Sequence, residues 1–524
     1  LTEMWERFSF YGMKALLIYY LVKYHLFTDE AGNYIVGGYA AMVYALPVVG
    51  GYLADKYLGF RKAVIFGGVL LVLGHLGLAY EGHQAYLSEN GEVIQDKAAL
   101  DVFFFSLSLI ILGVGFLKAN ISSIVGALYE KEDIRRDSGF TIFYMGINLG
   151  SFIATLLCGW LGEKYGWGYG FGAAGIGMVL GLITFIYGQK YLMGKAEPKN
   201  PEVLKKKVLA GISVEWLIYI LSIASLFVIA QMVQRHTVVD WMLRITGAIA
   251  LLMIVFYSIK EEKIIRERLL ALTVLIIFSV VFWALFEQAY TSMNLYADRV
   301  LDREFFGWTI PGPWFLSLNA LFIILFAPVV AALWVKLGKY NPNTPVKFAF
   351  AIILVGLGFG MLVLGANVTP DGAKIAMIWL VLAYFLHTMG ELCLSPIGLS
   401  LVGKLAPKRF ASLLYGVFFI SNAAGYALAG SLGAIIPATG DKFQKAEVIG
   451  VNLQDVLDKK VTLTPEQVAL FEKEQLPVEY TSFAGFEIHN LYEFFMVFVV
   501  LCGIAAVILA VLSPRLKKMM NGMT

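Results

Sequence analysis

Charged side chains stand in the segment EMWERFSFYGMK, residues 3–14, immediately before the apolar run ALLIYYLV. Positions three, four and seven apart share one helix face, so Glu3, Arg7, Tyr11 and Lys14 form one polar stripe. Charge inside a bilayer is costly, and ionisable groups there face a cavity or a partner on an ion or substrate path. The spacing therefore predicts ion-pair and proton chemistry inside a membrane protein.

A purely structural role for this stripe is the alternative interpretation. Glu3 and Arg7 are spaced for an ion pair at a helix end, with Glu6 beside them. Lys14 lies two turns deeper than Glu6 and has no partner of its own on this helix. This unpaired cation favours a functional site that includes other helices.

Polar side chains in later apolar runs divide by charge between two halves of the chain. The deep cations Arg7, Lys14 and Lys118 belong to the first half, and the lone carboxylates Glu287 and Glu391 to the second. A cavity between the halves would have one basic and one acidic wall, which suits a zwitterion such as a short peptide or an amino acid. The neutral polar candidates are Tyr44, Asn148 and Asn319.

The same charges can couple transport to protons. A buried carboxylate beside a cation stays ionised, and it binds a proton once the cation turns to a substrate carboxylate. One charge crossing about 100 mV contributes roughly 2.3 kcal/mol. One co-transported proton could therefore concentrate a neutral zwitterion by somewhat under two decades, because tenfold is about 1.4 kcal/mol.

Composition places these residues in a polytopic α-helical membrane protein. Of 524 residues, 59% are hydrophobic and 15% charged, against roughly 25% charged in soluble domains. Apolar runs recur at the length of a spanning helix, and we expect about 14 of them in groups of six, two and six. The expected domains are a six-helix bundle (1–191), a linker with two additional helices (192–268) and a second six-helix bundle (269–524).

Two further features of the sequence support this organisation. Short motifs recur in both halves, and the charges in the loops differ between the two sides of the membrane. PVVGGYLADKYLG from Pro47 resembles PVVAALWVKLG from Pro328, each at the end of the second helix of its half. Lys and Arg gather in loops on one side, such as 56–62 and 260–268, and acids on the other. The positive-inside rule then predicts that both termini are cytoplasmic.

Several other classes of protein are not supported. A net charge of +3 does not indicate a nucleic-acid partner, and no zinc-protease, nucleophile-elbow or Walker motif indicates an enzyme. We expect no metal, no cofactor and no disulfide. The chain begins at Leu1, so we expect a few residues to precede it. The polar segment 437–488 lies outside the membrane; it predicts a capped helix in LTPEQVALFEKEQL, in an exposed spacer or a partner-binding element.

Motifs along nearly the whole chain resemble those of the proton-dependent oligopeptide transporters. EMWERFSFYG is similar to the family's ExxERFxYYG motif, FYMGINLGSF to FYxxINxGS, and GGYLADKYLGFRKAVIFGG to the loop signature after the second helix. GFLKANIS, FWALFEQ, SLNALFIILFAP and GELCLSPIGLS follow in the expected order. The resemblance implies the major facilitator fold with two additional helices between two six-helix bundles.

The resemblance also implies roles for individual residues. Proton coupling would involve Glu3, Glu6, Arg7 and Glu287. Lys14 would pair with Glu287 in an outer gate, and Lys118 with Glu391 when substrate is absent. The implied substrate-binding set is Arg7, Tyr11, Lys14, Tyr44, Lys118, Asn148, Trp283, Asn319 and Glu391.

The expected function is import of di- and tripeptides with protons by a monomer in the cell inner membrane. The alternative is a transporter of the same superfamily for another anion such as nitrate, or for another small zwitterion. Phe10 and Lys14 depart from the family's usual Tyr and Arg, and Phe418 stands where Trp is common. These departures concern side-chain preference more than the transport class.

Overall fold

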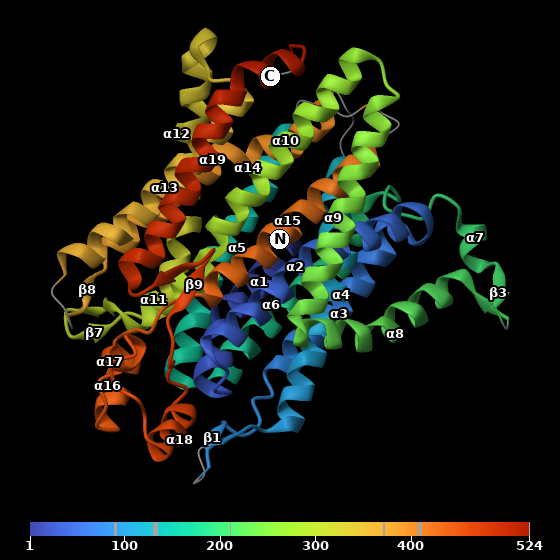
Figure 1. The fold of residues 1–524 in the computed structure, drawn as a ribbon. Helices are drawn as coiled ribbons and strands as arrows, with labels where there is room; N and C mark the ends of the chain where they lie inside the picture. The colour runs from blue at the N-terminus through green and yellow to red at the C-terminus, as the bar shows by residue number, and fades with distance from the viewer. Residues whose placement is uncertain are drawn as a thin grey trace.

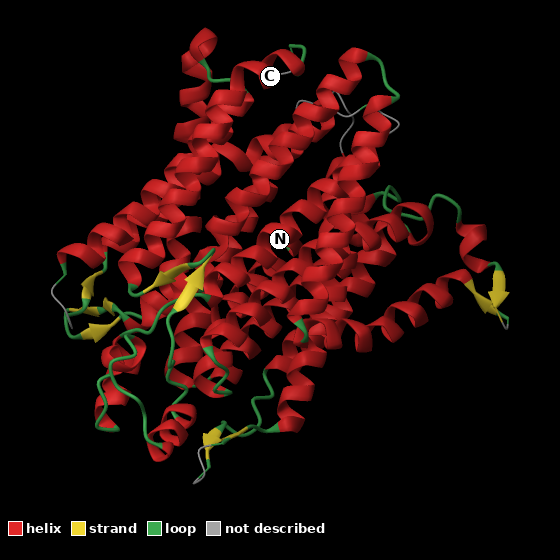
Figure 2. Ribbon diagram, in the orientation of Figure 1, coloured by secondary structure: helices red, strands yellow, loops and turns green. Residues whose placement is uncertain are grey.

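Helices make up most of the computed structural model, and strands occur only as short ladders in loops (Figure 2). The structure describes residues 1–524 except 89–91, 129–134, 210, 370–372, 406, 408–410 and 523–524. Four ladders are antiparallel and one, β5 with β8, is parallel. Among the described residues, these loop ladders are the one departure from an all-α fold. The strands are β1 (Tyr86–Leu87), β2 (Val93–Ile94), β3 (Lys207–Leu209), β4 (Ile212–Ser213), β5 (Leu301–Asp302), β6 (Glu304–Phe305), β7 (Trp308–Thr309), β8 (Ile375–Ala376), β9 (Thr481–Phe483) and β10 (Phe486–Ile488).

Six long helices form the N-terminal half, drawn from blue to teal in Figure 1. All except α1 are among the 13 helices of the described chain that are long and apolar enough to cross a membrane. Helix α1 has the length, but its charged stripe lowers its apolar character, and counting it gives the 14 spans expected. The helices are α1 (Thr2–Tyr19), α2 (Asp29–Leu53), α3 (Phe60–Leu78), α4 (Lys97–Leu128), α5 (Arg135–Tyr165) and α6 (Trp167–Gly188).

The middle pair and the C-terminal half follow in chain order. The short helix α7 (Pro201–Lys205) leads to α8 (Val214–Gln234) and α9 (His236–Ile259). Helix α8 packs on α4 and α2 of the first half, whereas α9 packs mainly on α15 and α10 of the second. The pair therefore straddles the two halves. The C-terminal half contains α10 (Lys263–Phe286), α11 (Ser292–Arg299), α12 (Ser317–Leu337), α13 (Thr344–Val368), α14 (Ile378–Leu405), α15 (Ala411–Ala434) and α19 (Leu491–Met519).

The halves meet mainly where α2 packs on α15 and α5 on α12. Gly37 and Gly430 allow the first of these close approaches, since a Cβ built on Gly37 would lie 2.7 Å from the Cα of Gly430. Small residues at such crossings let helix backbones approach within a bilayer, where packing rather than hydrophobicity drives association. A larger side chain at either glycine would force the two halves apart.

A break between α10 and α11 positions the first acidic candidate. The chain forms a 3₁₀ turn at Glu287–Tyr290, so α10 does not continue directly into α11. Gln288 Nε2 donates to Ala284 O at 3.1 Å and to Ala429 O at 3.0 Å, while Thr291 and Ser292 donate their hydroxyls to Gln288 Oε1. These side chains satisfy backbone and amide groups that a break at membrane depth leaves open.

Residues 437–488 form a small unit between α15 and α19, which we call the outer domain; the end of the molecule that it covers is the outer end. It lies at the lower left of Figure 1. Its core is a separate cluster that includes Leu453 and Phe471. The expected capped helix is present: Thr464 and Gln467 form a capping box. The elements are α16 (Gly440–Val448), α17 (Leu453–Leu457), α18 (Pro465–Lys473) and the hairpin β9–β10.

Candidate functional site

The charged stripe of α1 is buried and partly self-paired. Arg7 Nε donates to Glu3 Oε1 at 2.9 Å and lies 2.6 Å from Glu6 Oε2. The three side chains are at most 7% exposed. One guanidinium therefore faces two carboxylates. Glu3 Oε2, both Glu6 oxygens and Arg7 Nη2 have no hydrogen-bond partner within the described chain, so this group retains capacity to bind a proton or a ligand.

Lys118 on α4 completes a basic wall without being neutralised by an ion pair. Its Nζ lies 3.4 Å from the centroid of the Tyr44 ring, and no hydrogen-bond partner is found for it among the described residues. Its charge interacts with those of Arg7, Glu6 and Glu3 on α1. A buried ammonium that rests on an aromatic face is stabilised less than one held by a carboxylate. Lys118 is therefore free to attract an anionic group.

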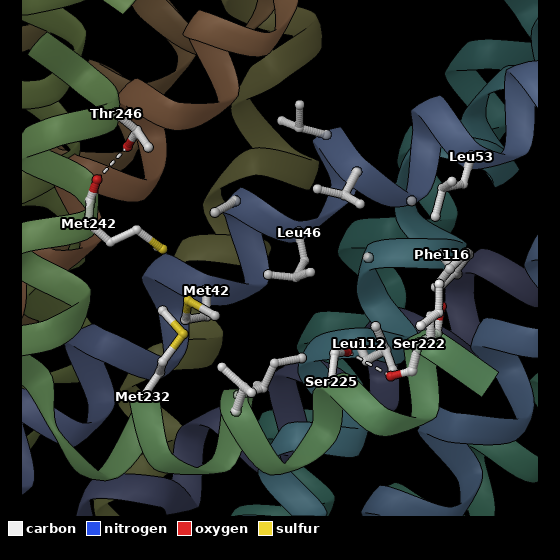
Figure 3. A pocket seen from close by; sticks show the side chains of 18 of the residues that line it. Met42, Leu46, Leu53, Leu112, Phe116, Ser222, Ser225, Met232, Met242 and Thr246 are labelled. Atoms are coloured by element: carbon white, nitrogen blue, oxygen red, sulfur yellow. Dashed lines mark hydrogen bonds between the residues drawn. The ribbon is translucent and has the colours of Figure 1, made fainter. Parts of the chain in front are cut away.

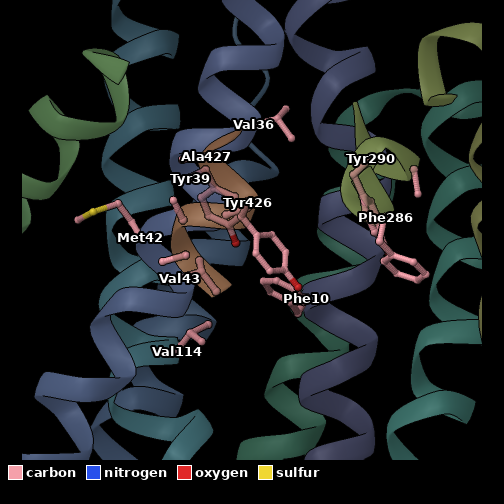
Figure 4. Close-up of a cluster of buried hydrophobic side chains, with 14 of the residues drawn as sticks. Phe10, Val36, Tyr39, Met42, Val43, Val114, Phe286, Tyr290, Tyr426 and Ala427 are labelled. Carbon is pink, nitrogen blue, oxygen red and sulfur yellow. The ribbon is translucent and has the colours of Figure 1, made fainter. Parts of the chain in front are cut away.

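Lys14 and Glu287 form the ion pair that the resemblance implied. Lys14 Nζ donates to Glu287 Oε2 at 2.6 Å, and both side chains are almost completely buried. The pair joins α1 to the break between α10 and α11. Tyr290 lies beneath the ammonium, with its ring centroid 3.7 Å from Nζ, and Tyr426 lies 5.0 Å away. Figure 4 shows Phe10, Tyr426, Tyr290 and Phe286 gathered in this region.

A narrow cavity of about 70 Å³ lies beside this pair. That volume accommodates several water molecules at about 10–15 Å³ each, so a peptide would require its walls to separate. Four predicted residues from the N- and C-terminal halves, Tyr11, Tyr44, Trp283 and Asn319, line it together with both candidate carboxylates. The other lining residues are Phe286, Ala289, Tyr290, Leu316, Tyr384, His387 and Tyr426.

Several of these lining residues were missed by the sequence analysis. Tyr290 stacks on Tyr11 with centroids 6.4 Å apart, and Tyr426 stacks on Tyr44 at 4.2 Å. His387 is held within its own half by a contact between Nε2 and Val355 O at 3.1 Å. The proximity of Tyr290 to Glu287 was a usable sequence signal. For Tyr426 the chain offers no such signal, because α15 reaches the site only through tertiary packing.

The acidic wall is held by residues of α12 and α14. Asn319 Nδ2 donates to Glu391 Oε2 at 2.8 Å and to Thr388 Oγ1 at 3.1 Å. Thr388 in turn donates to Tyr384 O one turn earlier. No cation lies within ion-pair distance of Glu391 in the part of the chain described here. This carboxylate is therefore oriented by an amide and available to a cationic ligand group.

Two expectations need correction. Lys118 and Glu391 do not form an ion pair here, because Lys118 rests on Tyr44 in one half while Asn319 holds Glu391 in the other. Asn148 is buried but, like Arg7, Lys14 and Lys118, does not line the cavity; its Nδ2 donates to Tyr144 O of the preceding turn at 3.0 Å.

Further ion pairs join the halves at the outer end, and the sequence analysis did not identify them. Arg299 of α11 grips Asp29 of α2 with two hydrogen bonds of 2.6 and 2.7 Å. Lys23 Nζ lies 2.6 Å from Asp298 Oδ1, and Arg303 bridges Asp298 at 3.0 Å and Glu163 at 3.5 Å. The outer end is thus closed by charges that cross from one half to the other.

A second, larger pocket has no such chemistry. It lies between α2, α4, α8 and α9, and its lining is apolar apart from Ser222, Ser225 and Thr246 (Figure 3). Ser225 and Thr246 bond to carbonyls of their own helices. It contains no charged group that could recognise a zwitterion. The narrow cavity is the candidate site because it lies between the two halves and is lined by Glu287 and Glu391.

The chain belongs to the POT family, whose PTR2 model matches residues 61–449. It is 42% identical over 433 residues to the uncharacterized transporter YclF of Bacillus subtilis, covering 82% of this chain and 85% of that protein. It is 37% identical over 459 residues to the peptide transporter YePEPT of Yersinia enterocolitica, covering 84% and 87%. Identity to a di-/tripeptide transporter of Lactococcus lactis is 35% over 472 residues, covering 86% and 91%.

Solved structures of POT transporters have the same fold. A peptide transporter in complex with alafosfalin aligns with a TM-score of 0.74 and 33% identity, covering 99% of this chain and 94% of that one. A POT family transporter in complex with 5-aminolevulinic acid aligns with a TM-score of 0.74 and 27% identity, covering 98% and 95%. The predicted family and the major facilitator fold are confirmed: this is a membrane transporter.

Proposed function

We propose that this chain is a proton-coupled symporter that imports di- and tripeptides by alternating access. The observation that carries the proposal is the separation of charge across the site. Arg7 and Lys118 form a basic wall in one half, and Glu391 an acidic point in the other. The two ends of a peptide carry charges of the complementary signs. The names of relatives, a peptide transporter and a di-/tripeptide transporter, support this choice.

Each wall has a defined part in this proposal. Arg7 and Lys118 receive the peptide carboxylate, and Glu391 with Asn319 receives the amino group. Tyr11, Tyr44 and Trp283 line the space between them. Tyr11 and Tyr44 interact electrostatically with Arg7 on one side and with Glu391 on the other, which supports a position between the two walls.

Coupling to protons follows from competition for the cations. When a peptide carboxylate approaches Arg7, it competes with Glu6 for the guanidinium, and a proton from the acidic side then neutralises Glu6. At the second pair, protonation of Glu287 weakens its bond to Lys14 and releases a contact between the halves. Proton binding at these carboxylates therefore favours separation at the outer end.

We also propose a location, an oligomeric state and a set of moving parts for the transporter. The transporter lies in the cell inner membrane with both termini in the cytoplasm, in accordance with its loop charges. It works as a monomer without cofactor or catalysis, driven by the proton gradient. Residues 1–191 and 269–524 move as the two halves, with 192–268 as the linker.

Nitrate and other small zwitterions are less well supported as substrates. Nitrate has no cationic group, so it would leave Glu391 and Asn319 without a ligand. A free amino acid has both charges, but they lie close together, and one wall would lose its partner.

Uptake of labelled dialanine into proteoliposomes tests the proposal. With an acidic outside and an inside-negative potential, we expect accumulation that a protonophore abolishes and that tripeptide, but not alanine or nitrate, competes. Uptake of nitrate without dialanine uptake would contradict it.

Acidification in this assay leaves key outer-loop charges intact. Backbone N–H groups of Ala99 and His83 hold the pKa of Asp96 at about 2, and the Lys460 ammonium holds the pKa of Asp458 at about 2. Both carboxylates are stabilised as anions, and their contribution to stability is lost only as the pH falls through about 2. A response between pH 5 and 7 therefore comes from other groups.

A further inference from the structure

The outer domain contacts the half of the molecule to which it does not belong in sequence. It is inserted between α15 and α19 of the C-terminal half. Lys442 Nζ on α16 nevertheless lies 2.9 Å from Oδ2 of Asp29, the first residue of α2. Gln475, just after α18, donates from Nε2 to Leu26 O at 2.7 Å in the turn between α1 and α2. Both contacts would have to break if the halves separated at this end.

Asp29 lies at the centre of a network of ion pairs between the two halves. Asp29 is 7% exposed and accepts two hydrogen bonds from the Arg299 guanidinium. Lys442 forms a second ion pair with the Oδ2 atom of Asp29. Asp441 lies 4.0 Å from Arg299 Nε, so two cations face two carboxylates. Charge-assisted hydrogen bonds are stronger than neutral ones, and Asp29 and Arg299 are at most 11% exposed. One carboxylate of the N-terminal half is thus held by α11 and by the outer domain together.

The outer domain has a core of its own and is attached to the C-terminal half. Its separate apolar core buries Phe471 to 1% exposure, and Lys445 pairs with Glu474 at 3.2 Å between α16 and the end of α18. Thr481 Oγ1 donates to Ile435 O at 2.9 Å and anchors the domain to the end of α15. Because the outer domain is attached to the C-terminal half and bonded to the N-terminal half, it holds the two halves together at the outer end.

We propose that the outer domain is a fastening for the closed outer end, and that Lys442 and Gln475 are positioning residues for the transport cycle. They touch no substrate and act by stabilising the state in which α1, α2 and α11 are joined. Their relevance to import depends on the proposed function, but their effect on conformation does not. The interaction surface is the face of α16 and of the α18 terminus, and its partner is the α1–α2 turn of the same chain.

Distance measurements between spin labels test the proposal without transport. Labels at Glu30→Cys in the N-terminal half and Phe306→Cys in the C-terminal half are both on exposed positions, and the three native cysteines are buried. In the double variant Lys442→Gln, Gln475→Ala, we expect the fraction of molecules with a longer distance between the two labels to be at least threefold larger than in the parent protein. Lys442→Arg should retain the original distribution.

Lys445→Gln is the matched control. It removes a cation from the same helix, but its partner Glu474 belongs to the outer domain itself, so the distance should not change. Hydrogen exchange of α16 and α18 checks that the domain stays folded in each variant. An unchanged distance in a folded Lys442→Gln, Gln475→Ala variant overturns the proposal, even if dialanine uptake is normal. A shifted distance supports it, even if dialanine is not transported.

Discussion

The outer end and the centre of this transporter use the same kinds of charge in opposite ways. Between the narrow cavity and the outer end, cations reach across to the other half, as Lys14 does to Glu287 beside the cavity and Arg299 to Asp29 at the outer end. Two other charges stay within their own half: Lys118 rests on Tyr44, and Glu391 accepts from Asn319. The first arrangement holds the halves together, and the second leaves charges available to a ligand.

The difference follows from which groups compete for each charge. An ion pair across the interface is satisfied only in one conformation, so breaking it has a cost whenever that end opens. A charge held by a neutral amide or an aromatic ring can exchange that partner for a ligand group at lower cost. The molecule thus separates conformational control from ligand capture, and the variants below test this separation.

The largest effect is expected at the buried Lys14–Glu287 pair that joins the two halves. Lys14→Met leaves Glu287 buried without a counter-charge, and removal of one partner of such a pair costs about 3–5 kcal/mol. We expect a clear drop in the thermal unfolding temperature of the purified protein. The double variant Lys14→Met, Glu287→Gln should recover most of it, whereas strictly additive losses would show that the two groups do not depend on each other.

The next effect concerns coupling at Glu6. Glu6→Gln cannot bind and release a proton, so exchange of labelled peptide should continue while proton-driven accumulation falls to equilibrium. The lost driving force is about 2.3 kcal/mol for one charge at about 100 mV. Glu30→Gln, which changes an exposed carboxylate in the first turn of α2, should accumulate peptide normally. Retained accumulation in Glu6→Gln would exclude this residue from the coupling site.

A smaller effect is expected at the central acidic wall. Glu391→Gln retains the shape that Asn319 holds but loses the negative charge, so half-saturation by dialanine should rise about tenfold, which is about 1.4 kcal/mol. An N-acetylated dipeptide lacks the amino charge and should lose nothing further in the variant. If dialanine uptake kept its original half-saturation, Glu391 would be a structural residue.

The smallest effect is expected at Lys23. Its side chain is 39% exposed, and its partner Asp298 also receives Arg303. Exposed pairs contribute about 0–1 kcal/mol, so Lys23→Gln should leave the unfolding temperature within a few degrees of the parent. A loss as large as that of Lys14→Met would show that the exposed pair stabilises the protein as much as the buried pair does, which is contrary to this expectation.

The site could be predicted only in part from the chain. The α1 stripe was predictable because Glu3, Arg7 and Lys14 repeat at helical spacing, and the structure buries all three. The Lys14–Glu287 pair came from the family resemblance, since no spacing rule connects residues 273 positions apart. Tyr426 and the Asp29–Arg299–Lys442 network were not predicted, because their partners come from helices that only folding brings together.

Apolar runs of spanning length, broken by a few charged positions, were enough to determine the class of protein, the number of spans and the candidate charges. A bilayer allows few backbone solutions, so length and hydropathy are sufficient there. Which charges pair was decided only by the tertiary structure. Lys14 and Lys118 are both deep cations in sequence, yet one meets a carboxylate and the other an aromatic ring. Pairing depends on separations of a few ångströms between helices, and one-dimensional spacing does not specify them.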